Sequence, residues 1–208
     1  MTHLSDYLED AVLDHIVGTA ALTSPTAWGS LHDGHPVETG ANELTGGSYA
    51  RQTIVFAAAS GGTAANTVQE EWDLTGVTAG TVFFVGLFDA STVGNFLWSI
   101  PLGGTANTFT AQDTGDVFTS YGHGLANDDR LVLGASPGSA LPTGVTEAII
   151  YHVVGITAST FQVSLTMGGA AVALTTDGEG ISYFVDEKTF NAGDTFRIAI
   201  GDLDLFID

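Results

Sequence analysis

The order of hydrophobic and polar positions predicts one helix at the start of the chain. Apolar residues recur there at helical spacing, at Leu4, Leu8, Ala11 or Val12, and Ile16. Carboxylates in the first turns suit the positive end of the helix dipole, and Gly18 ends the pattern. Because a short amphipathic helix is marginal alone, we expect it to pack on a sheet or on a neighbouring subunit.

From about Ala27 the pattern changes to short apolar runs broken by turn residues, which predicts strands. We expect them at residues 27–31, 49–57, 68–74, 82–89 and 96–100. Residues 90–95 resemble a hairpin loop with Gly94 as its hinge, and residues 60–66 a flexible loop. The run 82–88 is apolar on both faces, so we expect it to be covered on both sides.

A second group of strands follows a linker-like run at residues 103–108. We expect short strands at 116–119, 130–134, 149–154, 160–165 and 171–174, separated by turns such as Gly122-His123-Gly124 and Asp177-Gly178. Five short strands within about 75 residues are typical of a small barrel. Longer strands resume at 183–185, 195–200 and 203–207.

These patterns together predict a mainly β fold with a domain inserted into another. An N-terminal helix plus an antiparallel β-sandwich would form a discontinuous base from residues 1–106 and 181–208. A small barrel-like domain at residues 107–180 would be inserted into one of its loops. Insertions succeed at exposed loops whose ends stay close together.

Charge narrows the classes of partner. The 208 residues include 24 acidic and 4 basic ones, for a formal net charge of −20. Nucleic-acid binding requires cations that displace counterions from phosphates, and anionic membranes also attract basic segments, so we expect neither partner. The acidic surface would keep the protein soluble; alternatively, it would meet a basic partner or bind cations.

The chain shows no sign of export or of membrane insertion. It has no cysteine, which excludes disulfides and thiolate chemistry. No charged-then-apolar signal segment opens it, and its longest apolar runs, such as residues 81–88, are too short to span a bilayer. We expect a protein that is made and kept in the cytoplasm, or assembled there into something larger.

The histidines offer weak candidates for chemistry. His32 and His35, with Asp33 between them, are suitable metal ligands, but no further Cys or His lies at a convincing spacing. We therefore interpret the stretch as an exposed loop. His123 lies between two glycines, which favours a tight turn over a catalytic base. No Gly-x-Ser-x-Gly elbow accompanies it.

Two carboxylate clusters are candidate sites: Glu70, Glu71 and Asp73, and Asp202, Asp204 and Asp208. Paired carboxylates can hydrolyse glycosides or bind Ca²⁺, but neither cluster has the spacing of an EF-hand loop. We interpret both as solvated strand faces, with calcium as the alternative. The glycine pairs, such as Gly46-Gly47, lack the continuation of a phosphate loop and predict turns.

The aromatic residues leave two interpretations open. Phe96 and Trp98, opposite residues 82–88 in the expected hairpin, would be core or would line an oligomer interface. A carbohydrate-binding module would need exposed aromatics such as Trp28, Trp72 or Trp98 beside carboxylates. We predict no catalytic, cofactor-binding or metal-binding residues.

Several segments resemble small virion proteins of tailed bacteriophages, of the kind described as tail fibre or head decoration proteins. They are residues 4–19, 46–52, 85–90 with 95–98, and 188–196 with 201–203. In shorter members, the strand at residues 96–101 runs almost directly into the segment at 186–195. The intervening residues resemble a phage β-module at 118–125, 129–133, 151–154 and 160–164.

The resemblance implies a non-enzymatic virion protein. We expect a capsid decoration (cement) protein that binds the major capsid protein and stabilises the head. A tail fibre or tail-tip protein that binds other tail proteins and contacts the host surface is the alternative. A homo-oligomer is expected, with a trimer favoured because capsids offer threefold sites and closed oligomers are symmetric.

Overall fold

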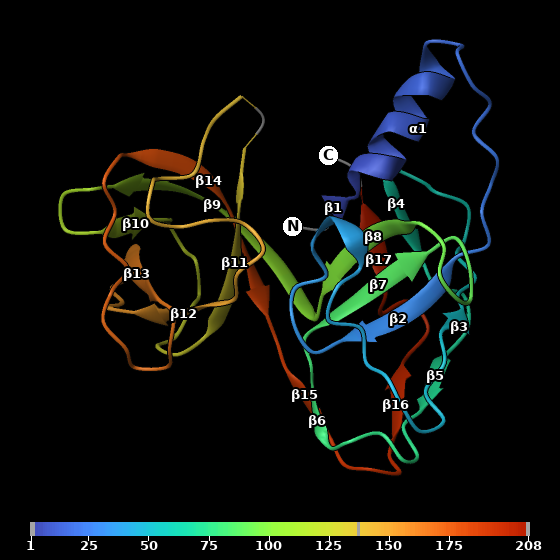
Figure 1. Cartoon of the computed structure of the whole chain (residues 1–208). Helices are drawn as coiled ribbons and strands as arrows, with labels where there is room; N and C mark the ends of the chain where they lie inside the picture. The colour runs from blue at the N-terminus through green and yellow to red at the C-terminus, as the bar shows by residue number, and fades with distance from the viewer. Residues whose placement is uncertain (1–2, 137, 207–208) are drawn as a thin grey trace. The chain divides into compact units, whose positions relative to one another are not determined.

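The computed structural model describes residues 3–136 and 138–206, and it is mainly β (Figure 1). The chain separates into two compact units. One, the base, holds the described residues up to Ile100 and from Glu187 onward; the other, the barrel, is Pro101–Asp186. The predicted fold class, mainly β with an N-terminal helix, antiparallel sheets and a small barrel, is confirmed.

The helix of the base, α1 (Asp6–Ile16), follows a short strand, β1 (His3–Leu4). The Ser5 side chain caps it by accepting a hydrogen bond from the Leu8 N–H at 3.3 Å. No residue of α1 is fully buried, and Ile16 is 71% exposed. The stripe is partly covered within the chain, since Leu8, Ala11 and Val12 are half-buried and Leu8 and Ala11 line a hollow together with Leu97 of the neighbouring sheet.

The base is built from one larger sheet and three two-stranded ones, all antiparallel. The larger sheet has the order β1-β8-β7-β2-β3, with β2 (Trp28–His32), β3 (Gln52–Thr53), β7 (Phe84–Phe88) and β8 (Phe96–Pro101). The smaller sheets pair β4 (Thr63–Ala65) with β17 (Asp204–Phe206), β5 (Glu70–Asp73) with β16 (Thr195–Ile198), and β6 (Gly80–Val82) with β15 (Lys188–Phe190). A 3-10 turn, η1 (Val37–Thr39), follows β2.

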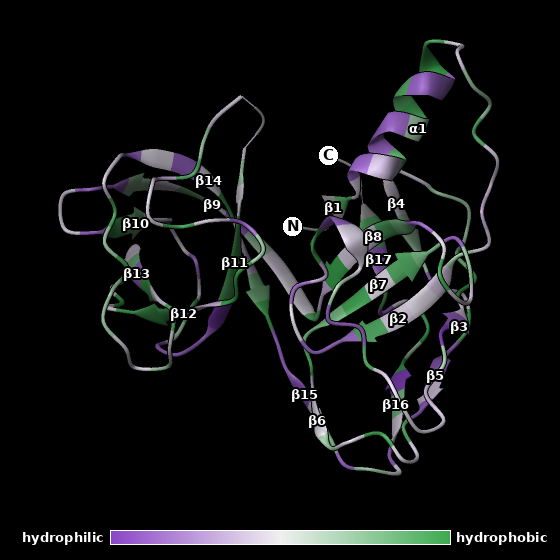
Figure 2. Ribbon diagram, viewed as in Figure 1, coloured by the Kyte–Doolittle hydropathy of each residue, from purple (hydrophilic) through white to green (hydrophobic). Residues whose placement is uncertain are grey.

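Strand β7 lies at the centre of the base core. Phe84 and Val85, which point to opposite faces, are both 0% exposed, so the prediction of cover on both sides is confirmed for this strand. Figure 2 shows β7 as a hydrophobic segment. The ring of Phe88 contacts that of Phe96 edge to face at 5.1 Å between centroids. The apolar excess of this strand is therefore core.

Arg51 holds the loop that follows β7. Its guanidinium makes two hydrogen bonds to the Glu43 carboxylate, at 2.9 and 2.7 Å, and lies 3.2 Å from the centre of the Phe88 ring. It also donates to the carbonyl oxygens of Ala90 and Val93 at 3.1 and 2.6 Å. The predicted hairpin loop connects the neighbouring strands β7 and β8, as expected.

The barrel is closed, with the strand order β10-β13-β12-β11-β14-β9. Its strands are β9 (Gly103–Gln112), β10 (Val117–Thr119), β11 (Arg130–Ala135), β12 (Tyr151–Val154), β13 (Thr160–Ser164) and β14 (Gly178–Val185). Aromatic residues fill the interior: Phe118 and Phe161 stack at 5.3 Å, and Phe109 meets Phe118 edge to face.

Three details of the barrel differ from the sequence prediction. The run expected to be a linker, residues 103–108, is the first half of β9, and the turn at Asp177-Gly178 opens β14. Residues 171–174 form no strand. The long register between β9 and β14 explains the first two differences, because it supplies backbone hydrogen bonds to residues of low strand propensity. Similarly, the expected loop at 60–66 contains β4.

Candidate functional site

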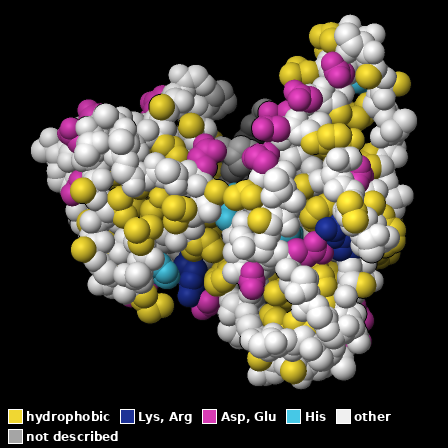
Figure 3. Space-filling view, viewed as in Figure 1, with side chains coloured by type: hydrophobic (Ala, Val, Ile, Leu, Met, Phe, Trp, Pro, Cys, Tyr) yellow, Lys and Arg dark blue, Asp and Glu magenta, His cyan; other side chains and the backbone are white. Residues whose placement is uncertain are grey.

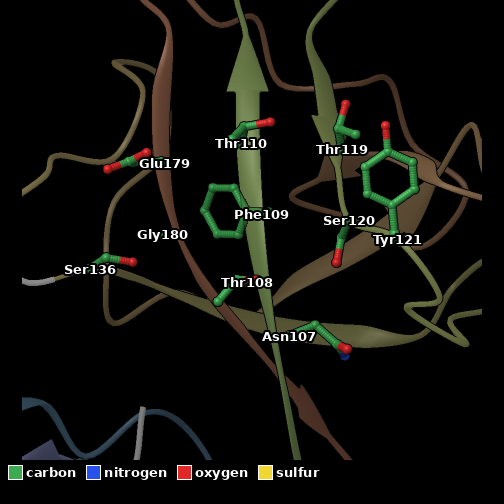
Figure 4. Close-up of a pocket in the computed structure, with 10 residues that line it drawn as sticks. All are labelled: Asn107, Thr108, Phe109, Thr110, Thr119, Ser120, Tyr121, Ser136, Glu179 and Gly180. Carbon is green, nitrogen blue, oxygen red and sulfur yellow. The ribbon is translucent and has the colours of Figure 1, made fainter.

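The barrel carries an open groove of about 460 Å³. Figure 4 shows its lining, which consists mostly of hydroxyl and amide side chains with two aromatic rings among them. The lining residues are Asn107, Thr108, Phe109, Thr110, Thr119, Ser120, Tyr121, Ser136, Glu179 and Gly180. The groove therefore combines polar side chains with the apolar surface of Phe109 and Tyr121.

The strand register places these side chains. Thr110 on β9 lies opposite Thr119 on β10 on one side and opposite Glu179 on β14 on the other. Figure 4 shows Thr110, Thr119 and Tyr121 side by side. Phe109, which alternates with the two exposed threonines of β9, points into the barrel core and is 4% exposed.

Gly180 brings the backbone of β14 close to its neighbour. A Cβ atom at this position would lie 2.3 Å from the Gly134 carbonyl oxygen and 2.9 Å from the Phe109 ring. No larger residue fits without a shift of backbone, so glycine keeps β11, β14 and β9 in register beneath the groove.

Tyr121 is the most exposed part of the lining, with 87% of its surface accessible. It follows β10 and precedes Gly122, which has φ +69°, so the ring stands in a turn and not on a strand. Among the described residues, its ring and hydroxyl make no hydrogen bond or ring contact. The tyrosine is therefore an aromatic surface open to solvent.

A second hollow of about 430 Å³ shares Asn107 with the groove. It is lined by Thr105, Asn107, Gly122, His123, Gly124, Leu125, Asp129 and Phe184. The loop at residues 119–125 thus contributes to both hollows. The expected tight turn is confirmed, since both glycines that flank His123 have positive φ.

His123 is buried, with 7% exposed surface. Its Nδ1 accepts a hydrogen bond from the Leu125 N–H at 3.0 Å, so the neutral ring carries its proton on Nε2. That atom is buried and has no hydrogen-bond partner among the described residues. The ring packs edge to face on Phe161 at 5.6 Å. His123 is therefore mainly a structural residue of the turn.

The two hollows are acidic. Their charged lining residues, within the part of the chain that the structure describes, are Glu179 and Asp129, and neither hollow is lined by Lys or Arg. The Asp129 carboxylate accepts a hydrogen bond from the Ala126 N–H at 2.7 Å, which holds the loop. The Glu179 side chain is exposed and makes no hydrogen bond to a described residue, so its carboxylate is available as an acceptor.

The His32–His35 stretch of the base is structural. His32 is 0% exposed; its Nδ1–H donates to the Ala41 carbonyl at 2.7 Å, and its Nε2 accepts from the Ser30 hydroxyl at 2.8 Å. Burial lowers the pKa of His32 to about 4. The expectation of an exposed loop is wrong for His32, which belongs to β2 and whose two nitrogens are both occupied within the protein.

The first carboxylate cluster lies along β5. Glu71 and Asp73 share the exposed face, as predicted, while Glu70 is buried. Burial raises the pKa of Glu70. Hydrogen bonds from Arg197, at 2.7 Å, and Gln69 lower the pKa of Glu71, and hydrogen bonds from Thr75 lower that of Asp73.

The second cluster is not assembled within the described residues. Asp202 and Asp204 are exposed, and Asp208 lies outside the residues that the structure describes. No group of three or more His, Cys, Asp or Glu side chains with the geometry of a metal site occurs in residues 3–136 and 138–206.

The tryptophans do not form a carbohydrate platform. Trp72 is 0% exposed and donates to the Gly29 carbonyl at 3.2 Å, Trp98 is 6% exposed, and Trp28 is half-buried. Among the described residues, the exposed aromatics are Tyr7, at 49%, and Tyr121, which is the more exposed of the two. The position of Tyr121 directly before a Gly-His-Gly turn, outside any apolar alternation, is the sequence signal that could have identified it.

The helices of the described residues are not long and apolar enough to cross a bilayer. Comparison with known proteins gives one family: the model of Gp80, podophage GP4 fiber I protein gp80, matches residues 3–122. The match runs through the first segment of the base and continues across β9 and β10 to the loop beside the groove. No curated protein matches the chain.

Proposed function

The chain belongs to the podophage GP4 fiber I protein gp80 family, and on this premise we propose that it is a tail-fibre component whose barrel contacts the host surface. The family match is the observation that carries the proposal, because it covers more than half of the sequence. The open groove of the barrel, with the exposed ring of Tyr121, supports the contact role. Concave sites with a few placed polar groups are typical of ligand binding.

The fibre assignment replaces the capsid decoration protein that the sequence favoured. Both are virion structural proteins, and the match to a fibre family agrees better with the alternative that was held beside the decoration protein. In this proposal the partners are tail proteins, and the major capsid protein is not among them.

The expected mechanism is mechanical and not enzymatic, in keeping with a fibre family. The base would attach the chain to the virion, and the barrel would add a weak contact that many copies multiply through avidity. Assembly in the host cytoplasm and a homotrimeric state remain part of the proposal.

The surface of α1 supports association of the base with other chains. Leu13, Ile16 and Val17 are 58%, 71% and 67% exposed, beside the acidic residues of the same helix. Figure 3 shows apolar and acidic side chains next to one another along this helix. Apolar side chains that are exposed in one chain become favourable to bury on assembly.

Immunogold electron microscopy of intact particles tests the location. An antibody against Pro101–Asp186 should label the tail, and quantitative mass spectrometry should find few copies per virion. Label distributed over the head, with hundreds of copies, would overturn the fibre proposal in favour of a decoration protein. Native mass spectrometry of the purified chain gives the number of subunits, where a monomer would contradict the trimer.

A further inference from the structure

The groove and the second hollow are neighbours on the barrel, because they share Asn107 as a lining residue. The segment 119–125 lines both, with residues 119–121 in the groove and 122–125 in the second hollow. Each has a volume, about 460 and 430 Å³, within the range of small-molecule sites. Two neighbouring hollows of this size suit a ligand built of several small polar units, one in each hollow.

The aromatic ring of Tyr121 gives this surface an apolar platform. An aromatic face carries negative charge density and attracts the weakly positive C–H groups of a ligand that lies flat on it. A pyranose ring presents such a face of C–H groups, while its hydroxyls point outward at the rim. The 87% exposure of Tyr121 leaves its ring accessible to such stacking.

The polar lining supplies the hydrogen bonds that such a ligand needs. Among the described residues, the side chains of Thr110, Thr119, Ser136 and Glu179 make no hydrogen bond within the protein. Hydroxyls both donate and accept, and the Glu179 carboxylate can accept from two adjacent sugar hydroxyls at once. In the second hollow, the Asn107 amide offers a donor and an acceptor at the junction.

The negative charge of the lining favours neutral sugars over acidic ones. The charged groups of the lining are carboxylates, and the whole chain has a formal net charge of −20. Uronic acids, phosphorylated sugars and nucleic acids would be repelled by this field. A neutral oligosaccharide meets no such repulsion.

We infer that these two hollows, lined by residues 105, 107–110 and 119–125 with Ser136, Glu179 and Phe184, bind a neutral oligosaccharide of the bacterial surface, with Tyr121 as the stacking platform. The inference rests on the proposed function for the source of the sugar, and on the groove itself for its chemistry. It also identifies which residues of the barrel would set the range of hosts.

The test uses the full-length chain on an array of neutral and uronate-containing oligosaccharides, followed by affinity measurement on the best hit. The wild type should bind neutral members and leave the acidic ones unbound. Tyr121→Ala should weaken binding at least about tenfold, as removal of a central aromatic contact does. Tyr121→Phe should retain most of the affinity because the ring remains.

Glu179→Gln should weaken binding through loss of a charged acceptor, and two base variants are matched controls. Asp202→Asn removes an exposed carboxylate and Tyr7→Ala an exposed tyrosine, 49% accessible, outside the barrel. Both should bind as the wild type does. Circular dichroism should show equal folding for all variants, since Tyr121 makes no contact on which the fold depends.

Two results would overturn the inference: no binding of any neutral member, or equal affinity of Tyr121→Ala and wild type. Labelling of host cells separates this failure from failure of the proposed function. If wild type and Tyr121→Ala label host cells equally, the host-contact role stands but does not depend on this groove. Array binding without cell labelling would retain the sugar site and remove the host contact. Immobilised lipopolysaccharide and exopolysaccharide, presented separately, identify the source of the sugar.

Discussion

The Arg51 side chain should carry a large share of the stability of the base. It is 10% exposed, and it joins the Glu43 carboxylate, two loop carbonyls and the Phe88 ring at one point. Burial also raises the pKa of Tyr49, whose hydroxyl donates to Glu43 at 3.1 Å and accepts the Leu31 N–H at 2.8 Å. The Arg51 interactions therefore extend into β2.

The expected effect of Arg51→Met follows from these contacts. Removal of one partner from a fully buried ion pair costs about 3–5 kcal/mol in the free energy of unfolding. Because the Glu43 side chain is 19% exposed and can be partly solvated, we expect about 2 kcal/mol for this pair. Loss of the contact with the Phe88 ring adds about 0.5–1 kcal/mol. The loop carbonyls are near solvent, where water can replace the arginine. We expect a total loss of about 3 kcal/mol in the free energy of unfolding of the base.

Differential scanning calorimetry measures the effect. The melting temperature of the base should fall by about 10 °C, while the barrel transition should not move. Arg197→Met is the matched control, because the ion pair of Arg197 with Glu71 is 58% and 47% exposed and should contribute little. The double variant Arg51→Met with Glu43→Gln should lose less than the sum of the single losses. A fall in melting temperature no larger than that of Arg197→Met would refute the reasoning. A loss in the double variant equal to the sum of the two single losses would refute it as well.

Three further perturbations test the two cores. The pKa of His32 falls to about 4 on folding, so the unfolded chain binds the proton first as the pH is lowered. The free energy of unfolding, measured by urea titration, should therefore decrease by about 3 kcal/mol between about pH 6.5 and pH 4. In His32→Gln the free energy of unfolding should depend less steeply on pH over this range. Gly86→Ala would place a Cβ 2.4 Å from His32 Nε2, and chemical denaturation should show a loss of about 1–3 kcal/mol in the base. Phe118→Ala, at a site with 0% exposure, should cost about 3–5 kcal/mol in the barrel transition alone, and an equal shift of both transitions would contradict two separate cores.

Local patterns predicted the elements whose apolar residues alternate or cluster. The helix at Asp6–Ile16 and the strands β2, β7, β8 and β11 lie where hydrophobic periodicity indicated them. Strand β9 was missed because its first half contains Gly, Thr, Ala and Asn, and its pairing partner β14 lies about 70 residues away in the chain. Pairing between segments so far apart in the chain leaves no signal in the local sequence of either strand.

The candidate site was beyond sequence prediction for the same reason. The groove combines residues of β9, the loop after β10, the end of β11 and the start of β14, and only Tyr121 is unusual in its own segment. Likewise, the spacing of His32 and His35 gives no indication that one imidazole is fully buried. Burial depends on Ser30, Ala41 and Gly86, which the fold brings together from separate segments.

The first and last residues of the barrel segment lie next to each other in space, although they are far apart in the sequence. The Asp186 N–H donates to the Leu102 carbonyl at 2.7 Å, so its two ends are joined by a backbone hydrogen bond. A segment with adjacent ends can be replaced by another without stretching the scaffold that carries it. Recombination between phages can therefore exchange the whole barrel for another domain at this junction. If the barrel has the proposed host-contact role, the same junction is a graft point for redirecting a phage to a chosen bacterium.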